Sequence, residues 1–102
     1  MSIKITVVNK HHKQSGEYIG RGSPLGNPFP IDVLNGQTRE VVIRDYREWL
    51  KSQIHYNVPA VCNELNRLVN LAQQGELKLQ CFCAPLPCHG DVIKQVLLEA
   101  MK

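Results

Sequence analysis

Hydrophobic and polar residues alternate at the start of the chain. Ile3, Ile5 and Val7 would lie on one side of a strand, and Thr6 and Val8 on the other. A period of two is typical of β structure, so we expect a strand that ends near Asn9. Because both sides carry apolar residues, the pattern favours a central strand of a sheet.

Two longer segments carry hydrophobic residues at intervals of three and four, the spacing of an amphipathic helix. The first helix is expected to have Thr38 as its N-cap and to run to about Gln53. The second has Pro59 in its first turn and Gly75 as a natural stop. The apolar stripes consist of Val42, Ile43, Tyr46, Trp49 and Leu50 in the first helix, and of Val58, Val61, Cys62, Leu65, Leu68, Val69 and Ala72 in the second. We therefore expect Cys62 in the core.

Alternation returns near the C-terminus, where residues 77–83 have the period of a strand. This period places Cys81 and Cys83 on the same face. After a proline-rich turn, a last helix is expected to start near His89 or Gly90. Its apolar stripe consists of Val92, Ile93, Val96, Leu97 and Ala100.

A long loop follows the first strand, because residues 10–37 hold most of the glycines and prolines. Within it, only residues 17–19 have the composition of a short strand. A loop of this length in a compact domain is usually functional. Helical crossovers join the two clear strands, which predicts an α/β fold with a small, mostly parallel sheet covered by about three helices.

The composition is that of one globular domain. The chain has 102 residues, of which 43% are hydrophobic and 21% charged, so residues 1–102 are expected to form a single domain. The longest apolar runs are too short to cross a bilayer, which argues against a membrane protein. The N-terminus lacks the features of a signal peptide, so we expect a cytoplasmic location.

Charge and cysteine usage limit the partners and the cysteine chemistry. The formal net charge is +3 and the basic residues are scattered, which permits a small anionic ligand and does not favour nucleic acid. In a reducing compartment the four cysteines are expected to be thiols or metal ligands rather than disulfides.

The second strand and the turn after it hold three cysteines and a histidine within nine residues. Cys81 and Cys83 from the strand, Cys88 from a helix N-terminus and His89 could together form a tetrahedral zinc site. The spacing differs from the C-x2-C of a standard zinc knuckle, and the adjacent Cys88 and His89 would tend to point in different directions.

Two other interpretations of this segment stay open. Cys88 could be a reactive thiol, since a helix dipole and the neighbouring His89 both favour the thiolate. Alternatively, Cys81 and Cys83 are small core residues and His89 caps the helix, with Asp91 placed favourably in its first turn.

The long loop has the composition of an anion-binding loop. The candidate ligand-binding residues in it are Gly20, Arg21, Ser23, Gly26 and Asn27. Glycines let the backbone approach a ligand, and Arg21 offers a bidentate donor for phosphate or carboxylate. Ser23 and Asn27 can hydrogen-bond a sugar or a base. The loop matches neither the G-x-G-x-x-G pattern nor the P-loop, so no particular nucleotide is indicated.

Arg39, near the start of the first helix, could add a second cation to an anion site. The structural alternative for the loop is a series of tight turns, with Arg21 paired to a carboxylate such as Asp45 or Glu48. Phe29 is expected to fill the core rather than to stack on a base.

The two predicted parallel strands bring these segments together. Their carboxyl ends lead into the Gly/Pro loop and into the cysteine turn, and open α/β sheets bind ligands at that edge. We therefore expect one site built from both.

The chain resembles domain of unknown function 4326, a small family found in bacteria and their phages. The resemblance rests on residues 8–9 (VN), 18–29 (YIGRGSPLGNPF), 38–40 (TRE), 46–50 (YREWL) and 79–91 (LQCFCAPLPCHGD). It implies that Arg21, Gly26, Asn27, Pro28, Arg39, Cys81, Cys83, Cys88, His89 and Asp91 occupy motif positions of the family. The resemblance marks the same two segments and names no reaction.

Taken together, these patterns predict a small ligand-binding domain, or an enzyme acting on a nucleotide, a nucleobase or a related anionic metabolite. In this hypothesis Arg21 and Arg39 hold the anion and Asn27 orients the ligand. The polar or catalytic wall consists of Cys88, His89 and Asp91. The alternative is a zinc-stabilised adaptor that binds protein or nucleic acid, in which the cysteines are structural.

Overall fold

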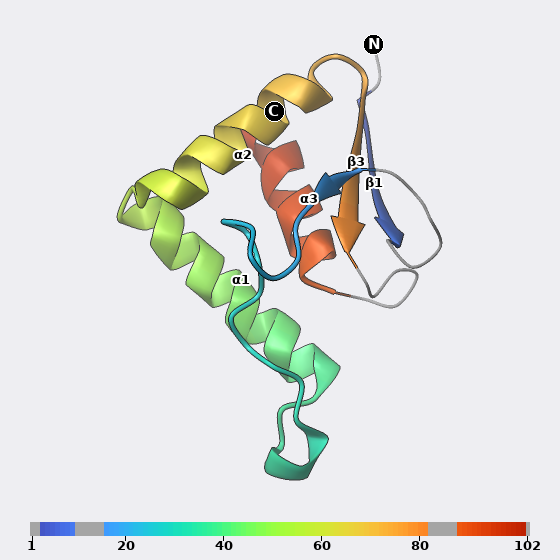
Figure 1. The fold of residues 1–102 in the computed structure, drawn as a ribbon. Coiled ribbons are helices and arrows are strands. Elements are labelled where there is room, and N and C mark those ends of the chain that lie inside the picture. Colours follow the sequence, from blue (N-terminus) through green and yellow to red (C-terminus); the bar gives the residue numbers. More distant parts are fainter. Residues whose placement is uncertain (1–2, 10–15, 82–87, 102) are drawn as a thin grey trace.

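The computed structural model describes residues 3–9, 16–81 and 88–101 (Figure 1). The elements in chain order are β1 (Lys4–Asn9), β2 (Glu17–Tyr18), the 3-10 turn η2 (Val33–Asn35), α1 (Arg39–His55), α2 (Pro59–Ala72), β3 (Glu76–Cys81) and α3 (His89–Ala100). This is the predicted α/β fold. The predicted strand at 77–83 is confirmed as far as Cys81, and residues 82–87, Cys83 included, lie outside the described part.

The three strands form one parallel sheet in the order β1-β3-β2. Asn9 pairs with Cys81, and Tyr18 pairs with Gln80, so all three strands end at the same edge of the sheet. The prediction that the first strand is central was wrong, because β3 lies between β1 and β2. Apolar residues on both faces of a strand indicate that other elements pack above and below it. They do not show whether the strand has hydrogen-bonded neighbours on one edge or on both, and only the latter makes it central.

The helix boundaries follow their local signals. Thr38 caps α1 by accepting a hydrogen bond from the Val41 amide, with 3.3 Å between nitrogen and oxygen. Pro59 opens α2, where a missing amide hydrogen costs nothing. Gly75 has a φ of 120°, in the region that favours glycine, in the turn that leads to β3.

The helices pack on the face of the sheet that carries Leu77, Leu79 and Cys81. These side chains join residues of all three helices in a single hydrophobic cluster. Figure 1 shows α3 between the sheet and α1, and it contacts both β1 and α1. Cys62 is only half-buried on α2, so its predicted place in the core was wrong: it lies at the border of the apolar stripe. Within the described ranges, none of the helices has the length and apolarity needed to span a membrane.

Candidate functional site

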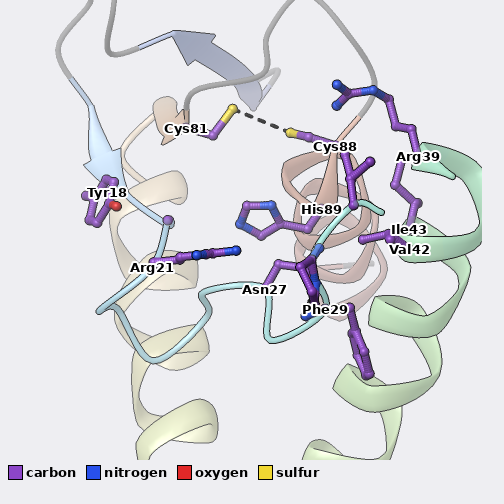
Figure 2. Close-up of a pocket in the computed structure, with 13 residues that line it drawn as sticks. Tyr18, Arg21, Asn27, Phe29, Arg39, Val42, Ile43, Cys81, Cys88 and His89 are labelled. Atoms are coloured by element: carbon purple, nitrogen blue, oxygen red, sulfur yellow. Dashed lines mark hydrogen bonds between the residues drawn. The ribbon is translucent and has the colours of Figure 1, made fainter. Parts of the chain in front are cut away.

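A cavity of about 280 Å³ lies where the strands end, between the Gly/Pro loop, the start of α1 and the start of α3 (Figure 2). Its walls are formed by Tyr18, Gly20, Arg21, Asn27, Phe29, Pro30, Ile31, Arg39, Val42, Ile43, Cys81, Cys88 and His89. The structure thus brings the Gly/Pro loop and the cysteine segment together in one pocket.

The sequence candidates divide into two groups. Those that line the pocket are Gly20, Arg21, Asn27, Arg39, Cys81, Cys88 and His89. Ser23, Gly26 and Asp91 are not among its lining residues, and Cys83 lies outside the described residues. The three that do not line the pocket each have an identifiable structural contact.

Ser23 and Gly26 close the Gly/Pro loop on itself. The Gly20 carbonyl accepts hydrogen bonds from the Ser23 amide at 3.1 Å and from the Ser23 hydroxyl at 2.8 Å. The Gly26 amide in turn donates to the Ser23 carbonyl at 3.0 Å. A Cβ at position 26 would lie 2.6 Å from the Gly20 oxygen, so only glycine fits there. These residues shape the loop, and the Ser23 hydroxyl expected to meet a ligand is used within it.

The loop is anchored to α1 through Leu25 and Tyr46. The Leu25 side chain is fully buried, and its carbonyl accepts a hydrogen bond from the Tyr46 hydroxyl at 2.7 Å. Burial, with a smaller contribution from negative charge at Cys88, raises the pKa of Tyr46 far above its ordinary value. Tyr46 is therefore a neutral donor that holds the loop beneath the pocket.

Asn27 and Phe29 form the next part of the wall. The Asn27 side-chain oxygen accepts a hydrogen bond from the Phe29 amide at 2.8 Å, an Asx turn. The side-chain nitrogen of Asn27 is then the group that could donate a hydrogen bond to a ligand. Phe29 is half-buried: it packs against the core and also lines the pocket. The expectation that it fills the core is therefore only partly correct.

Two arginines stand on different sides of the pocket (Figure 2). Arg21 is exposed on the Gly/Pro loop, and Arg39 is half-buried as the first residue of α1. Among the described residues, no carboxylate forms an ion pair with Arg21. Asp45, one of its suggested partners, instead pairs with Arg44 at 3.3 Å. The geometry therefore does not support the interpretation of Arg21 as half of a structural ion pair.

Cys88 and Asp91 cap α3. The Cys88 sulfur accepts from the Gly90 amide at 3.3 Å, and the Cys88 amide donates to the Asp91 carboxylate at 3.1 Å. The two residues thus form a reciprocal capping arrangement at the helix start. Asp91 is exposed and faces its own helix terminus, which fits its expected helix-start position and does not support its expected place in the pocket wall.

His89 does not cap the helix; it reaches across to the other segment. Its Nε2 atom lies 2.6 Å from the carbonyl oxygen of Ile19, and because a carbonyl only accepts, Nε2 carries the proton. Burial lowers the pKa of His89, against the opposing effects of the Ile19 hydrogen bond and of negative charge at Cys81 and Asp91. The ring is thus neutral near pH 7, and Nδ1 is its remaining acceptor.

The two described cysteines of the segment form a close pair. The sulfur atoms of Cys81 and Cys88 are 3.4 Å apart, and the residues are only 1% and 3% exposed. Among residues 3–9, 16–81 and 88–101, no group of three or more cysteine, histidine or acidic side chains is placed to hold a metal. The predicted zinc set also needs Cys83, which lies outside these ranges.

The apolar wall of the pocket was not predicted from the sequence. Val42 and Ile43 belong to the stripe that predicted the first helix, but the N-terminal end of this stripe faces the pocket. Tyr18 also lines the pocket, and its ring lies so close to Gly20 that a Cβ there would overlap it. The Gly/Pro loop runs directly into the start of this helix, and that adjacency was a signal that could have shown the wall.

The chain has no match among curated proteins or among solved structures. Residues 5–99 match the model of the family called Domain of unknown function (DUF4326). The match covers nearly the whole described fold, pocket residues included, and the chain therefore belongs to the DUF4326 family.

Proposed function

We propose that the protein binds a small anionic metabolite that also has an apolar or planar part, such as a nucleotide, a nucleobase derivative or a related compound. The observation that carries this proposal is a single pocket in which Arg21 and Arg39 accompany an apolar wall.

The anion would be held by the two arginines. Guanidinium groups bind phosphate and carboxylate through paired hydrogen bonds. Arg21 is exposed and has no carboxylate partner among the described residues. Arg39 begins α1, where the helix dipole adds positive potential. An anion between these groups would gain both charge and directional hydrogen bonds.

The uncharged part of the ligand would lie against the apolar wall. Phe29, Val42 and Ile43 provide flat and branched surfaces, and the Asn27 amide nitrogen supplies a donor beside them. Ligand pockets usually enclose ~300–1,000 Å³. A cavity of about 280 Å³ lies just below that range, which favours a ligand of the size of a nucleobase or a monophosphate over a dinucleotide.

Catalysis, as an extension of binding, would rest on Cys88. It lines the pocket at the N-terminus of α3, where a negative sulfur is stabilised by the Gly90 amide and the helix dipole. Neutral His89 is next to it, with Nδ1 able to accept a proton. Asp91 has no part in this arrangement because it caps the helix.

Ligand binding is tested by the rise in melting temperature with nucleobases, nucleoside monophosphates and inorganic phosphate as probes. We expect at least one monophosphate to stabilise the protein, and Arg21→Gln and Arg39→Gln each to weaken its binding about tenfold or more. Arg44→Gln is the matched control, since Arg44 lies exposed on α1 and outside the pocket lining. If no probe shifts the melting temperature, or if Arg44→Gln has the same effect, the proposal fails.

A zinc-stabilised adaptor is the second candidate, favoured by the 3.4 Å separation of the Cys81 and Cys88 sulfurs. Two thiolates at such a distance could bind one soft metal ion together with ligands from elsewhere. Elemental analysis of untagged protein tests it. About one equivalent of zinc, with loss of the fold on chelation, supports the adaptor; metal-free folded protein excludes it.

A further inference from the structure

Cys81 and Cys88 lie at the junction of two elements. Cys81 is the last residue of β3, and Cys88 is the N-cap of α3. Their sulfur atoms are 3.4 Å apart, and both line the pocket (Figure 2). A disulfide bond is ~2.0 Å long, so a modest rotation of the two side chains would bring the sulfurs to bonding distance.

We propose that Cys81 and Cys88 form a reversible intramolecular disulfide by exchange with a small disulfide such as 2-hydroxyethyl disulfide. The pair is thus a site of modification in the wall of the same pocket. Both residues are almost fully buried, so the oxidant reaches them through the pocket that they line. An oxidant of small size is therefore required, and a protein disulfide would not gain access.

Cys88 is the sulfur that attacks first. Its sulfur accepts a hydrogen bond from the Gly90 amide at 3.3 Å and stands at the N-terminus of a helix of 12 residues. Both features favour negative charge on this sulfur. Cys81, at the end of a strand, lacks a helix terminus and acts as the resolving thiol.

The exchange is balanced in two steps. The Cys88 thiolate attacks one sulfur of the oxidant; the oxidant's S–S bond breaks, and one half leaves as a thiolate that takes up a proton. The Cys81 thiol then loses its proton and its sulfur attacks the Cys88 sulfur, releasing the second half as a thiol. Two protein thiols are oxidised by two electrons, and one small disulfide is reduced to two thiols.

The disulfide would also change the pocket. It would remove two thiol groups from the pocket wall and join the end of β3 to the start of α3, beside His89. We expect the affinity for the ligand to differ between the two redox states, and this expectation alone rests on the proposed function. Formation of the bond is read from mass and ligand binding from melting temperature, so failure of one is distinguishable from failure of the other.

The test uses the Cys62→Ser/Cys83→Ser variant, in which Cys81 and Cys88 are the remaining cysteines. The protein is incubated with 2-hydroxyethyl disulfide, denatured, alkylated and weighed. We expect loss of both alkylatable thiols and a monomer mass lower by about 2 Da, reversed by dithiothreitol. In the matched control, further substitution Cys81→Ser should leave Cys88 as a mercaptoethanol adduct, because the resolving thiol is gone.

Several results would overturn the proposal. These are two thiols that remain alkylatable, a persistent mercaptoethanol adduct while Cys81 is present, or a bond between two molecules. Peptide mapping of the oxidised wild-type chain serves as the second measurement if the variant does not fold. A Cys81–Cys88 peptide supports the proposal there, and a bond to Cys83, or zinc that protects the thiols until it is chelated, contradicts it.

Discussion

The Nε2 atom of His89 donates a hydrogen bond to the backbone carbonyl of Ile19 across 2.6 Å. Ile19 lies in the Gly/Pro loop directly after β2, and His89 is the first residue of α3, so this bond joins the two segments that form the pocket. Both groups are buried, which makes the bond costly to break without replacement. The shape of the pocket therefore depends on a neutral His89 with its proton on Nε2.

Stability should fall in acid because of His89. Burial lowers the pKa of this residue from its ordinary value of 6.5 in the folded state, so below pH 6.5 the unfolded chain binds a proton more readily than the folded one. The free energy of unfolding is then at its full value above pH 6.5 and falls as pH decreases, by at most about 1.4 kcal/mol per pH unit from this group. Urea denaturation between pH 5 and 8 measures it.

The matched variants for this measurement are His89→Gln and His55→Gln. Glutamine can still donate to Ile19 but does not titrate, so the slope of stability against pH should become shallower. His55 is exposed at the end of α1, and its replacement should leave the slope unchanged. An unaltered slope in His89→Gln would show that other groups cause the acid sensitivity.

Tyr46→Phe should destabilise the protein by about 1–3 kcal/mol. The change removes the hydroxyl that donates to Leu25 and leaves a buried carbonyl without that partner. Chemical denaturation measures the loss, and Tyr56→Phe is the control because Tyr56 is 74% exposed. Equal stability of the Tyr46→Phe and Tyr56→Phe variants would mean that the loop is not held by this bond.

Gly26→Ala should disturb the Gly/Pro loop. The new Cβ would lie 2.6 Å from the Gly20 oxygen, and backbone atoms on both sides must move, at a cost of about 1–3 kcal/mol. Gly22→Ala is the comparison: its φ of 94° makes alanine unfavourable, but nothing lies within 4 Å of the added Cβ. We expect weaker binding of a stabilising monophosphate only in Gly26→Ala. Comparable binding by both variants would contradict this prediction.

Asp91→Asn should affect stability and leave ligand affinity unchanged. The substitution weakens the bond to the Cys88 amide and removes a favourable charge from the start of α3, which costs roughly 0.5–2 kcal/mol. Glu99→Gln, near the other end of the same helix and exposed, is the control. A large loss of affinity or activity at unchanged stability would restore Asp91 to the pocket wall.

Much of the fold follows from local patterns in the chain. Periods of two and of three to four separate strands from helices, and Thr38, Pro59 and Gly75 mark helix boundaries because caps and breakers act within a few residues. The parallel sheet also implies that the segments after Asn9 and Cys81 share one edge. The candidate site could therefore be located, and most of its polar residues named, without coordinates.

Contacts between distant residues were not encoded in those patterns. Hydrophobic periodicity shows that a side chain is buried but not what covers it, so it placed β1 at the centre of the sheet and treated Val42 and Ile43 as core alone. His89 and Ile19 are 70 positions apart, and Asp91 could face either the pocket or its own helix start until the chain was folded. The sequence alone determines which polar groups are present and which segments carry them. Their hydrogen-bond partners depend on how the loop, α1 and α3 pack together, because those partners come from distant parts of the chain.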